Sequence, residues 1–439
     1  MQDWAGWLLL LFSFSIVLMW KSIRDDTKVV HAIWFCLVLN HAVVFFNVFG
    51  ATFIHGAEVA TGAYSSLVYS PDASTAHWNA VHLAALPEPK LFSFSDQTSS
   101  TDFFHVLLGN GAANYVSSLG FLYHTFGASL FFGEELSVLA FVLSCVVLVK
   151  LVDHLDLRRF RVGIVLLFGL LPSAMIYRSM TLRESWQALF FLLSVYWAIR
   201  LWKRPGILNA SFFLMFVLCM SSLHHGLARY AVYLVVISIC WSITGRKKNV
   251  CWARHLRFLF AGMLIVCIIL LSRKLGLLMT VNQAFEGSAG MRQSLLAYED
   301  VRSVYSLALN TSSVYGLVST IPKVFAQYMF APLPWQVENV KDILALLESM
   351  LRFVLLFFAI SSWRRSSGEV RSCYSFLLIA FLGMEFVWML GTVNWGTAIR
   401  HHVPGYGVIV LLGAPRLILV MRELSETFWR RKDSTMLPE

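Results

Sequence analysis

The chain is 439 residues long, and 58% of its residues are hydrophobic while only 14% are charged. Soluble domains carry about 25% charged residues, so this composition excludes an ordinary soluble protein. The net charge of +10 would suit a nucleic-acid-binding protein. Most of the basic residues, however, fall in short loops between apolar segments, where they indicate membrane topology and not a nucleic-acid partner.

Eleven apolar segments have the length and low charge that a helix needs to cross about 30 Å of hydrocarbon. They do not alternate apolar and polar residues as the strands of a membrane barrel do. We therefore predict an all-α, polytopic integral membrane protein in which residues 1–439 form a single transmembrane domain. The N-terminus has neither a basic n-region nor a small-residue cleavage motif, so the first segment is expected to be a retained span. In chain order, the predicted spans are 4–20, 29–54, 134–152, 162–178, 185–201, 207–223, 227–243, 256–272, 346–363, 372–392 and 403–421.

The distribution of basic residues predicts the orientation of these spans. With the N-terminus outside and the C-terminus inside, six short cytoplasmic segments hold 22 of the 35 Lys and Arg residues, and outward segments hold 11. This is the bias that the positive-inside rule requires. Two outward segments, about 55–133 and 273–345, are too long to be simple connectors, and loops of this length usually carry function. We therefore expect the working face to be non-cytoplasmic.

The first outward segment contains the sequence Pro71–Trp78, which includes Asp72 and His77. A carboxylate at the membrane–water boundary can accept a proton from a sugar hydroxyl, and a nearby histidine can share its hydrogen-bond network. An alternative interpretation is that Asp72 caps a short helix, since Asp is favoured at helix N-termini. The two roles are compatible.

A second candidate segment, Arg178–Ser185, forms a short outward turn that contains Arg178, Arg183 and Glu184. These side chains can form a local ion pair. The arginines can equally hold a phosphate, because guanidinium groups match phosphate oxygens. Glu184 provides a second carboxylate for catalysis.

Two further outward turns carry cationic side chains. Between the sixth and seventh spans, adjacent histidines precede Arg229. Because the two histidines point to different sides of a helix and no third ligand is near, a metal site is not favoured, and Arg229 is the candidate for anion binding. The turn after the tenth span holds Arg400, His401 and His402, which either bind a substrate anion or anchor the chain at the interface.

One carboxylate, Glu385, lies inside an apolar span. Intramembrane carboxylates are costly and are therefore candidates for function. A hydrogen bond between helices, made in the protonated state, is an equally good interpretation. The seven cysteines form no CxxC pair, so the sequence predicts neither a metal site nor a cofactor.

The outward carboxylates and arginines together suit a lipid-linked phosphate or diphosphate whose headgroup is handled at the membrane surface. The arginines would hold the phosphate leaving group, and a carboxylate would deprotonate the acceptor hydroxyl. Electrostatic stabilisation of departing charge is the main work of such a site.

Several of these segments resemble bacterial GT-C-type, polyprenyl-phosphate-sugar-dependent glycosyltransferases. The sequence PDASTAHW resembles the Asp-Ala…His signature of their first external loop. Residues 111–139 and 170–193 are similar to the stretch that follows it and to a Pro-Ser…Leu-Arg-Glu segment. FAPLPW and NWGTAIRHH resemble elements of related polysaccharide (O-antigen-like) polymerases and oligosaccharide transferases.

This resemblance implies an inverting transferase that takes a hexosyl or oligosaccharyl group from an undecaprenyl carrier in the bacterial inner membrane, on the periplasmic face. It places the catalytic acid of the family on Asp72. Many members have an Asp-Glu pair where this chain has Asp72-Ala73, which argues against metal assistance and keeps the polymerase branch open. The implied partners are a lipid-linked sugar donor, a glycan or lipid acceptor, membrane lipids and other envelope polysaccharide assembly proteins.

Two other classes of protein compete with this interpretation. A transporter or flippase of lipid-linked sugars tends to show two-fold repeats and helices interrupted at the membrane midplane, and the sequence predicts neither. A structural subunit of a polysaccharide assembly would have no need of the carboxylates and arginines.

The orientation can be tested with reporter fusions. A reporter fused after Arg431 is expected to be active only in the cytoplasm, because the last span ends in a basic cytoplasmic segment. Alkaline phosphatase activity at this junction would contradict the predicted topology and invert every site assignment above.

Overall fold

A computed structural model describes residues 3–50, 71–87, 111–244 and 313–435, together with six single positions between 290 and 310. Within these residues every regular element is helical. The α-helices of seven residues or more are α1 (Trp4–Ile16), α3 (Thr27–Phe45), α5 (Pro71–Ala84), α7 (Gly111–Phe126), α8 (Leu130–His154), α9 (Arg161–Gly169), α10 (Pro172–Arg178), α11 (Glu184–Lys203), α12 (Ile207–Ser221), α13 (His225–Thr244), α16 (Val314–Phe330), α17 (Val340–Arg365), α18 (Gly368–Gly391), α19 (Trp395–His402) and α20 (Tyr406–Thr435).

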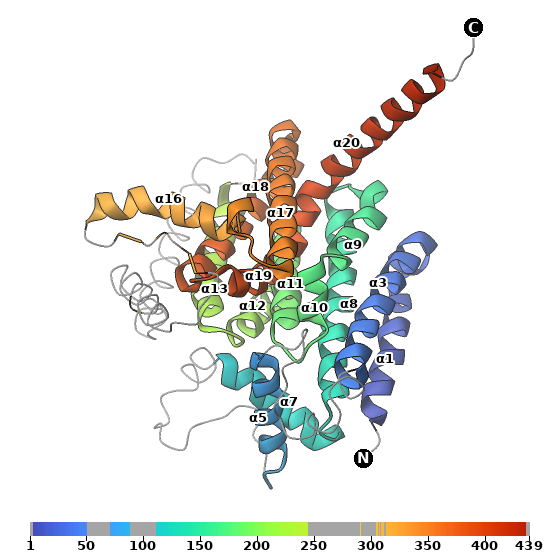
Figure 1. The fold of residues 1–439 in the computed structure, drawn as a ribbon, viewed down its shortest axis with the longest axis vertical. Helices are drawn as coiled ribbons and strands as arrows, with labels where there is room; N and C mark the ends of the chain where they lie inside the picture. The colour runs from blue at the N-terminus through green and yellow to red at the C-terminus, as the bar shows by residue number, and fades with distance from the viewer. Residues whose placement is uncertain are drawn as a thin grey trace.

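Helix α8 is the centre of the bundle. It is apolar along most of its length, 83% of its most apolar stretch is buried, and it packs against α1, α3, α9, α10 and α11. The N-terminus lies at the lower end of the bundle in Figure 1, and α20 projects from the upper end. The paired helices α5 and α7 lie at the lower end, beside the N-terminus.

The expected all-α membrane architecture is confirmed, but the predicted number of eleven spans is wrong. In the described part of the chain, six helices are long and apolar enough to cross a membrane, or seven if one bent pair is counted as a span. The six are Thr27–Gly50, Leu130–His154, His225–Ser242, Asp342–Arg365, Gly368–Gly391 and Trp395–Thr427.

The difference comes from helices that are shorter, less apolar or broken. The apolar helices at Trp4–Met19 and Ile207–Ser221 are too short to be among the six, and α11 is not among them. The predicted span 162–178 is a pair of helices bent by 69°. The predicted span 256–272 lies outside the described residues, as does much of the first half of the long segment 273–345.

The bend between α9 and α10 follows from Pro172, which has no N–H to donate to the carbonyl of Phe168 four residues earlier. Arg178 takes the place of the missing donor: its Nη1 donates to the Phe168 carbonyl over 2.8 Å. The guanidinium also lies 3.9 Å from the centre of the Phe168 ring. A cation thus satisfies the C-terminal end of α9, where the helix dipole is negative.

A carboxylate satisfies the other side of the break. Glu348 of α17 accepts hydrogen bonds from the backbone N–H of Ser173, over 2.5 Å, and from its hydroxyl. The Tyr406 hydroxyl donates to the same carboxylate over 3.2 Å, and Arg352 donates to Tyr406 over 2.8 Å. Unsatisfied backbone groups are costly in hydrocarbon, so Arg178 and Glu348 stabilise a break that Pro172 makes unavoidable. The apolar pattern predicted one continuous span over residues 162–178, and the structure has an interrupted helix there.

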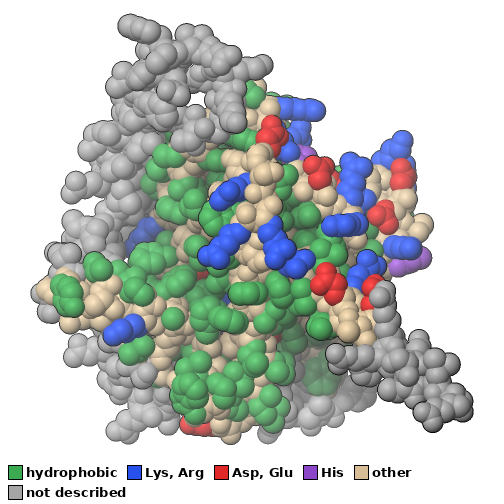
Figure 2. Space-filling model, turned by 90° about the horizontal axis from the view of Figure 1, so that it is seen from above, with side chains coloured by type: hydrophobic (Ala, Val, Ile, Leu, Met, Phe, Trp, Pro, Cys, Tyr) green, Lys and Arg blue, Asp and Glu red, His purple; other side chains and the backbone are tan. Residues whose placement is uncertain are grey.

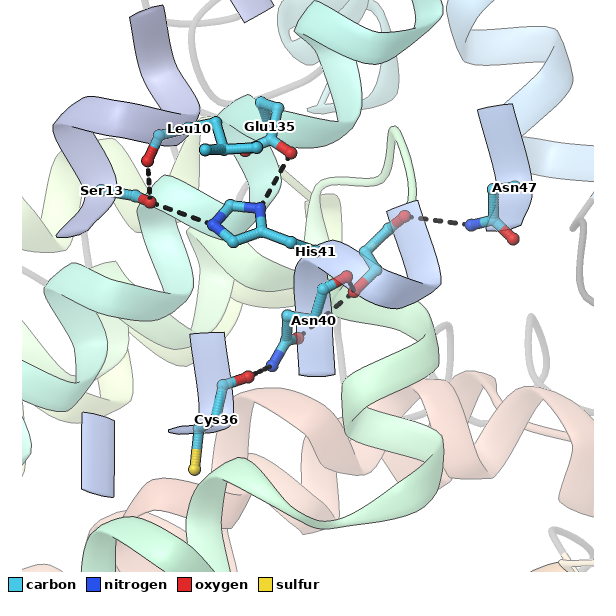
Figure 3. Close-up of polar contacts among 8 residues, drawn as sticks. Leu10, Ser13, Cys36, Asn40, His41, Asn47 and Glu135 are labelled. Carbon is cyan, nitrogen blue, oxygen red and sulfur yellow. Dashed lines mark hydrogen bonds and ion pairs between the residues drawn. The ribbon is translucent and has the colours of Figure 1, made fainter. Parts of the chain in front are cut away.

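A second buried polar network joins α1, α3 and α8 (Figure 3). The Ser13 hydroxyl donates to the Leu10 carbonyl, so the contact of 3.1 Å between Ser13 Oγ and His41 Nε2 requires a proton on Nε2. His41 Nδ1 lies 2.9 Å from Glu135 Oε1, and a proton must lie between these two atoms as well. Hydrogen bonds between buried polar side chains therefore connect α1 to α3 and α3 to α8.

Charged side chains gather at the upper end of the bundle, which Figure 2 views from above. There Arg161, at the start of α9, pairs with Asp26 over 3.2 Å and with Asp153 over 2.5 Å. These pairs tie together the ends of α3, α8 and α9.

The break predicts a specific sensitivity at Glu348. Glu348→Leu leaves the Ser173 N–H and hydroxyl and the Tyr406 hydroxyl without their acceptor, and we expect a loss of about 1–3 kcal/mol in the free energy of unfolding. Glu348→Gln keeps an acceptor oxygen and should lose less. The measurement is thermal unfolding of the purified protein in detergent, with the exposed Glu423→Gln as control. A Glu348→Leu variant that unfolds at the wild-type temperature would contradict this account of the break.

Candidate functional site

Helix α5 places Asp72 at the lower end of the bundle. The helix begins at Pro71, whose fixed φ suits the first helical position, so Asp72 lies in the first turn and does not precede the helix.

The opposite face of α5 is buried through Ala73, His77 and Ala80. His77 Nδ1 lies 2.8 Å from the Tyr123 hydroxyl of α7, and burial lowers the pKa of His77 to about 4. His77 is therefore a neutral residue that joins α5 to α7.

A cavity of about 630 Å³ lies beside α5. Helices α5 and α7, the start of α11 and one side chain of α19 form its walls. Its lining residues are Asp72, Thr75, Ala76, Asn79, His82, Leu83, Ala113, Tyr115, Val116, Ser117, Leu182, Arg183, Glu184 and Arg400.

Arg400 joins two carboxylates in this cavity. Its Nη1 pairs with Asp72 Oδ2, and its Nε lies 2.9 Å from Glu184 Oε1. The two carboxylates differ in environment, since the Asp72 side chain is 65% exposed and that of Glu184 only 2%. Glu184 is therefore a buried anion that depends on Arg400, while Asp72 can exchange its partner with solvent or a ligand.

The register of α19 decides which of three adjacent residues, Arg400, His401 and His402, faces the cavity. Asn394 caps this helix by accepting a hydrogen bond from the Thr397 N–H over 2.7 Å. Successive residues turn by about 100° around a helix, so Arg400, His401 and His402 face different neighbours. His401 lies 2.6 Å from the Thr392 hydroxyl, and His402 lies 2.6 Å from Glu385 Oε2. Only Arg400 of the three lines the cavity.

Arg183 is the second cation of the cavity. It precedes α11 and is half-buried. Burial lowers the pKa of Arg183, with Glu184 opposing this shift and Arg400 adding to it. Arg183 makes no ion pair within the described residues, so an anionic ligand in the cavity could pair with it.

Three buried oxygens of lining residues also lack hydrogen-bond partners within the described residues. They are the Tyr115 hydroxyl oxygen, Ser117 Oγ and Glu184 Oε2. Buried polar atoms are normally paired, so these atoms are available to a ligand that supplies a donor.

The structure thus brings together four of the nine predicted site residues, Asp72, Arg183, Glu184 and Arg400. Arg178 lies outside the cavity, at the break between α9 and α10, where it binds the Phe168 carbonyl. Arg229 is exposed on α13 and does not line the cavity. His77, His401 and His402 make the buried contacts described above.

Glu385, the carboxylate inside an apolar span, pairs with His402 between α18 and α19. His224, in the predicted histidine pair, packs with its ring centre 4.6 Å from that of Trp388. Burial, together with nearby Arg183, lowers the pKa of His224 to about 3. His224 is therefore neutral at physiological pH and adds no charge to the site.

Sequence reasoning missed two groups of residues. Thr75, Asn79 and His82 line the cavity with Asp72, and their spacing of three and four residues places them on one helix face. Glu348 and Arg352 form the polar network at the helix break. Like Glu385, both are charged residues inside a predicted apolar span, and this signal could have identified them.

In the part of the chain that the structure describes, no three or more His, Cys, Asp or Glu residues are grouped so that they could hold a metal ion. Comparison of the chain with protein-family models, with curated proteins and with solved structures gives no match. The residues and geometry of the cavity are therefore the only guide to function.

Proposed function

We propose that the chain is a membrane-embedded glycosyltransferase that uses a lipid-linked sugar donor, an undecaprenyl phosphate or diphosphate sugar, at the non-cytoplasmic face. The observation that carries this proposal is the meeting of two carboxylates and two arginines in one cavity. The cavity lies at the end of a bundle whose helices can cross a membrane. A substrate with an apolar tail and an anionic headgroup fits that position.

The two arginines would hold the phosphate of the donor. Guanidinium–phosphate hydrogen bonds are charge-assisted and often bidentate. Arg183 lines the cavity without an ion pair to the described residues, and Arg400 can exchange the exposed Asp72 for a phosphate oxygen while keeping the buried Glu184. Donor binding would therefore release Asp72 from its ion pair.

The released Asp72 would act as the general base. It accepts the proton of the acceptor hydroxyl as that oxygen bonds to the anomeric carbon of the donor. The bond between the anomeric carbon and the phosphate oxygen breaks at the same time, and the electron pair leaves with the phosphate. Arg183 and Arg400 stabilise the developing negative charge, and Glu184 keeps Arg400 in place.

Repeated transfer by the same machinery would make a polysaccharide repeat-unit polymerase, and the cavity suits either activity. In both cases we place the protein in the bacterial inner membrane, with its active face periplasmic, in cell-envelope or exopolysaccharide synthesis. The acceptor is then a glycan or a lipid-linked glycan.

The interrupted helix favours a second candidate function, a transporter of lipid-linked sugars. Interrupted helices in transporters direct their free ends at a substrate or ion. Here both ends of the break are occupied by side chains of the same chain, Arg178 and Glu348. The break therefore supports transport less than the cavity supports transfer.

The proposal is tested by Asp72→Asn, which keeps the size of the side chain and removes its charge. Loss of a general base should lower turnover about a hundredfold or more, whereas a residue that only makes an exposed ion pair with Arg400 would tolerate the change. The measurement is sugar transfer by the purified protein in liposomes with an undecaprenyl-linked donor.

The control is Asp25→Asn, which alters an exposed carboxylate outside the cavity and should leave turnover unchanged. Normal transfer in vitro and normal glycan synthesis in cells by Asp72→Asn would rule Asp72 out as the base. Glu184 would then be the remaining carboxylate of the cavity.

A further inference from the structure

One face of α5 carries a row of polar side chains that the proposed chemistry uses only at its first member. Asp72, Thr75, Asn79 and His82 follow one another at intervals of three, four and three residues, so they share one face of the helix. All four are exposed and all four line the cavity. At a rise of 1.5 Å per residue the row is about 15 Å long, which exceeds a single sugar ring.

The chemistry of this row differs along its length. Charge is concentrated near Asp72, where Arg183, Glu184 and Arg400 meet. Beyond it, Thr75 and Asn79 are neutral groups that both donate and accept hydrogen bonds. Asn79 and His82 make no hydrogen bond to the part of the chain that the structure describes.

The remaining walls beside the row combine apolar and hydroxyl groups. Ala76, Leu83 and Val116 line the cavity together with Tyr115 and Ser117. The buried Ser117 hydroxyl oxygen has no partner within the described residues. Apolar patches beside neutral hydrogen-bonding groups match a sugar ring, which has C–H faces and a rim of hydroxyls.

We propose that the α5 row, Thr75, Asn79 and His82, is a subsite for a neutral oligosaccharide acceptor of more than one sugar. The reacting hydroxyl lies at Asp72, and the sugars behind it extend along the row toward His82. This inference rests on the proposed function for the identity of the reacting end, but oligosaccharide binding can be measured without turnover. It selects an extended glycan, and not a lipid hydroxyl, as the acceptor.

The test is direct binding by the purified full-length protein in nanodiscs. The probes are neutral oligosaccharides of one to four sugars, made by partial hydrolysis of the polysaccharide from cells that express the chain. Affinity should rise from one sugar to three, because each added sugar meets further members of the row. Asn79→Leu and His82→Leu should each weaken binding of the three-sugar probe about tenfold and leave the one-sugar probe unchanged.

The matched control is Thr125→Val, an exposed position of α7 that does not line the cavity. It should leave the affinity for every probe at the wild-type value. Equal affinity for one-sugar and three-sugar probes, or wild-type binding by both Leu variants, would overturn the subsite.

Transfer assays separate this proposal from the proposed function. If the subsite is correct, Asn79→Leu raises the KM for long acceptors and leaves kcat near the wild-type value. Unchanged KM in an active Asn79→Leu variant would refute the subsite while the transferase stands. Length-dependent binding without transfer from any lipid-linked donor would refute the transferase while a glycan site stands.

Discussion

The Arg400 guanidinium holds together parts of the chain that are far apart in sequence. It pairs with Asp72, 328 residues earlier, and with Glu184 at the start of α11. Glu184 is buried, and a buried carboxylate without a counter-charge is strongly destabilising. Arg400 therefore permits the buried anion, fixes α19 against α11 and draws the start of α5 to the same point. The cavity, its charge and the exchange of partners in the proposed reaction all depend on this one side chain.

The break between α9 and α10 helps to position two residues of the same site, Arg183 and Glu184. Helix α10 leads directly into the turn that carries Arg183 and Glu184, so the bend sets the position from which this turn reaches the cavity. Ser179, which follows α10, donates a hydrogen bond to the Asn40 carbonyl of α3 over 3.1 Å. Opposite charges at the two ends of the break hold the bend in place. Pro172, Arg178 and Glu348 thus shape and stabilise the helix break. The charged residues of the cavity are not needed there and can bind a ligand.

Features of the fold that depend on local sequence pattern could be predicted from the sequence. Composition and apolar segments predicted an all-α membrane protein, and the outward loops and turns supplied nine candidate residues, four of which meet in the cavity. The number of spans was overestimated because apolar composition does not measure the length of a helix. Ile207–Ser221 is apolar but only 15 residues long, and Pro172 divides a segment that composition alone treats as continuous.

Features that depend on long-range packing could not be predicted. No local signal shows that Arg400, and not His401 or His402, meets Asp72, because the choice depends on the register of α19 against the bundle. Arg178 and Arg183 lie in one short segment, yet one satisfies a helix break and the other lines the cavity. The partner of Arg400 at Glu184 and the partner of Ser173 at Glu348 appear only when distant helices are brought together.

The central claim is that a phosphate and Asp72 compete for Arg400, and the affinity for a short-chain polyprenyl phosphate tests it most directly. Asp72→Asn should bind this ligand more tightly than wild type, by up to about fivefold, because an exposed ion pair of up to about 1 kcal/mol no longer has to be broken. Arg400→Lys should bind it more weakly, since Lys lacks the bidentate fork. Tighter binding by Asp72→Asn supports the exchange of partners at Arg400. Unchanged or weaker binding by Asp72→Asn would contradict it.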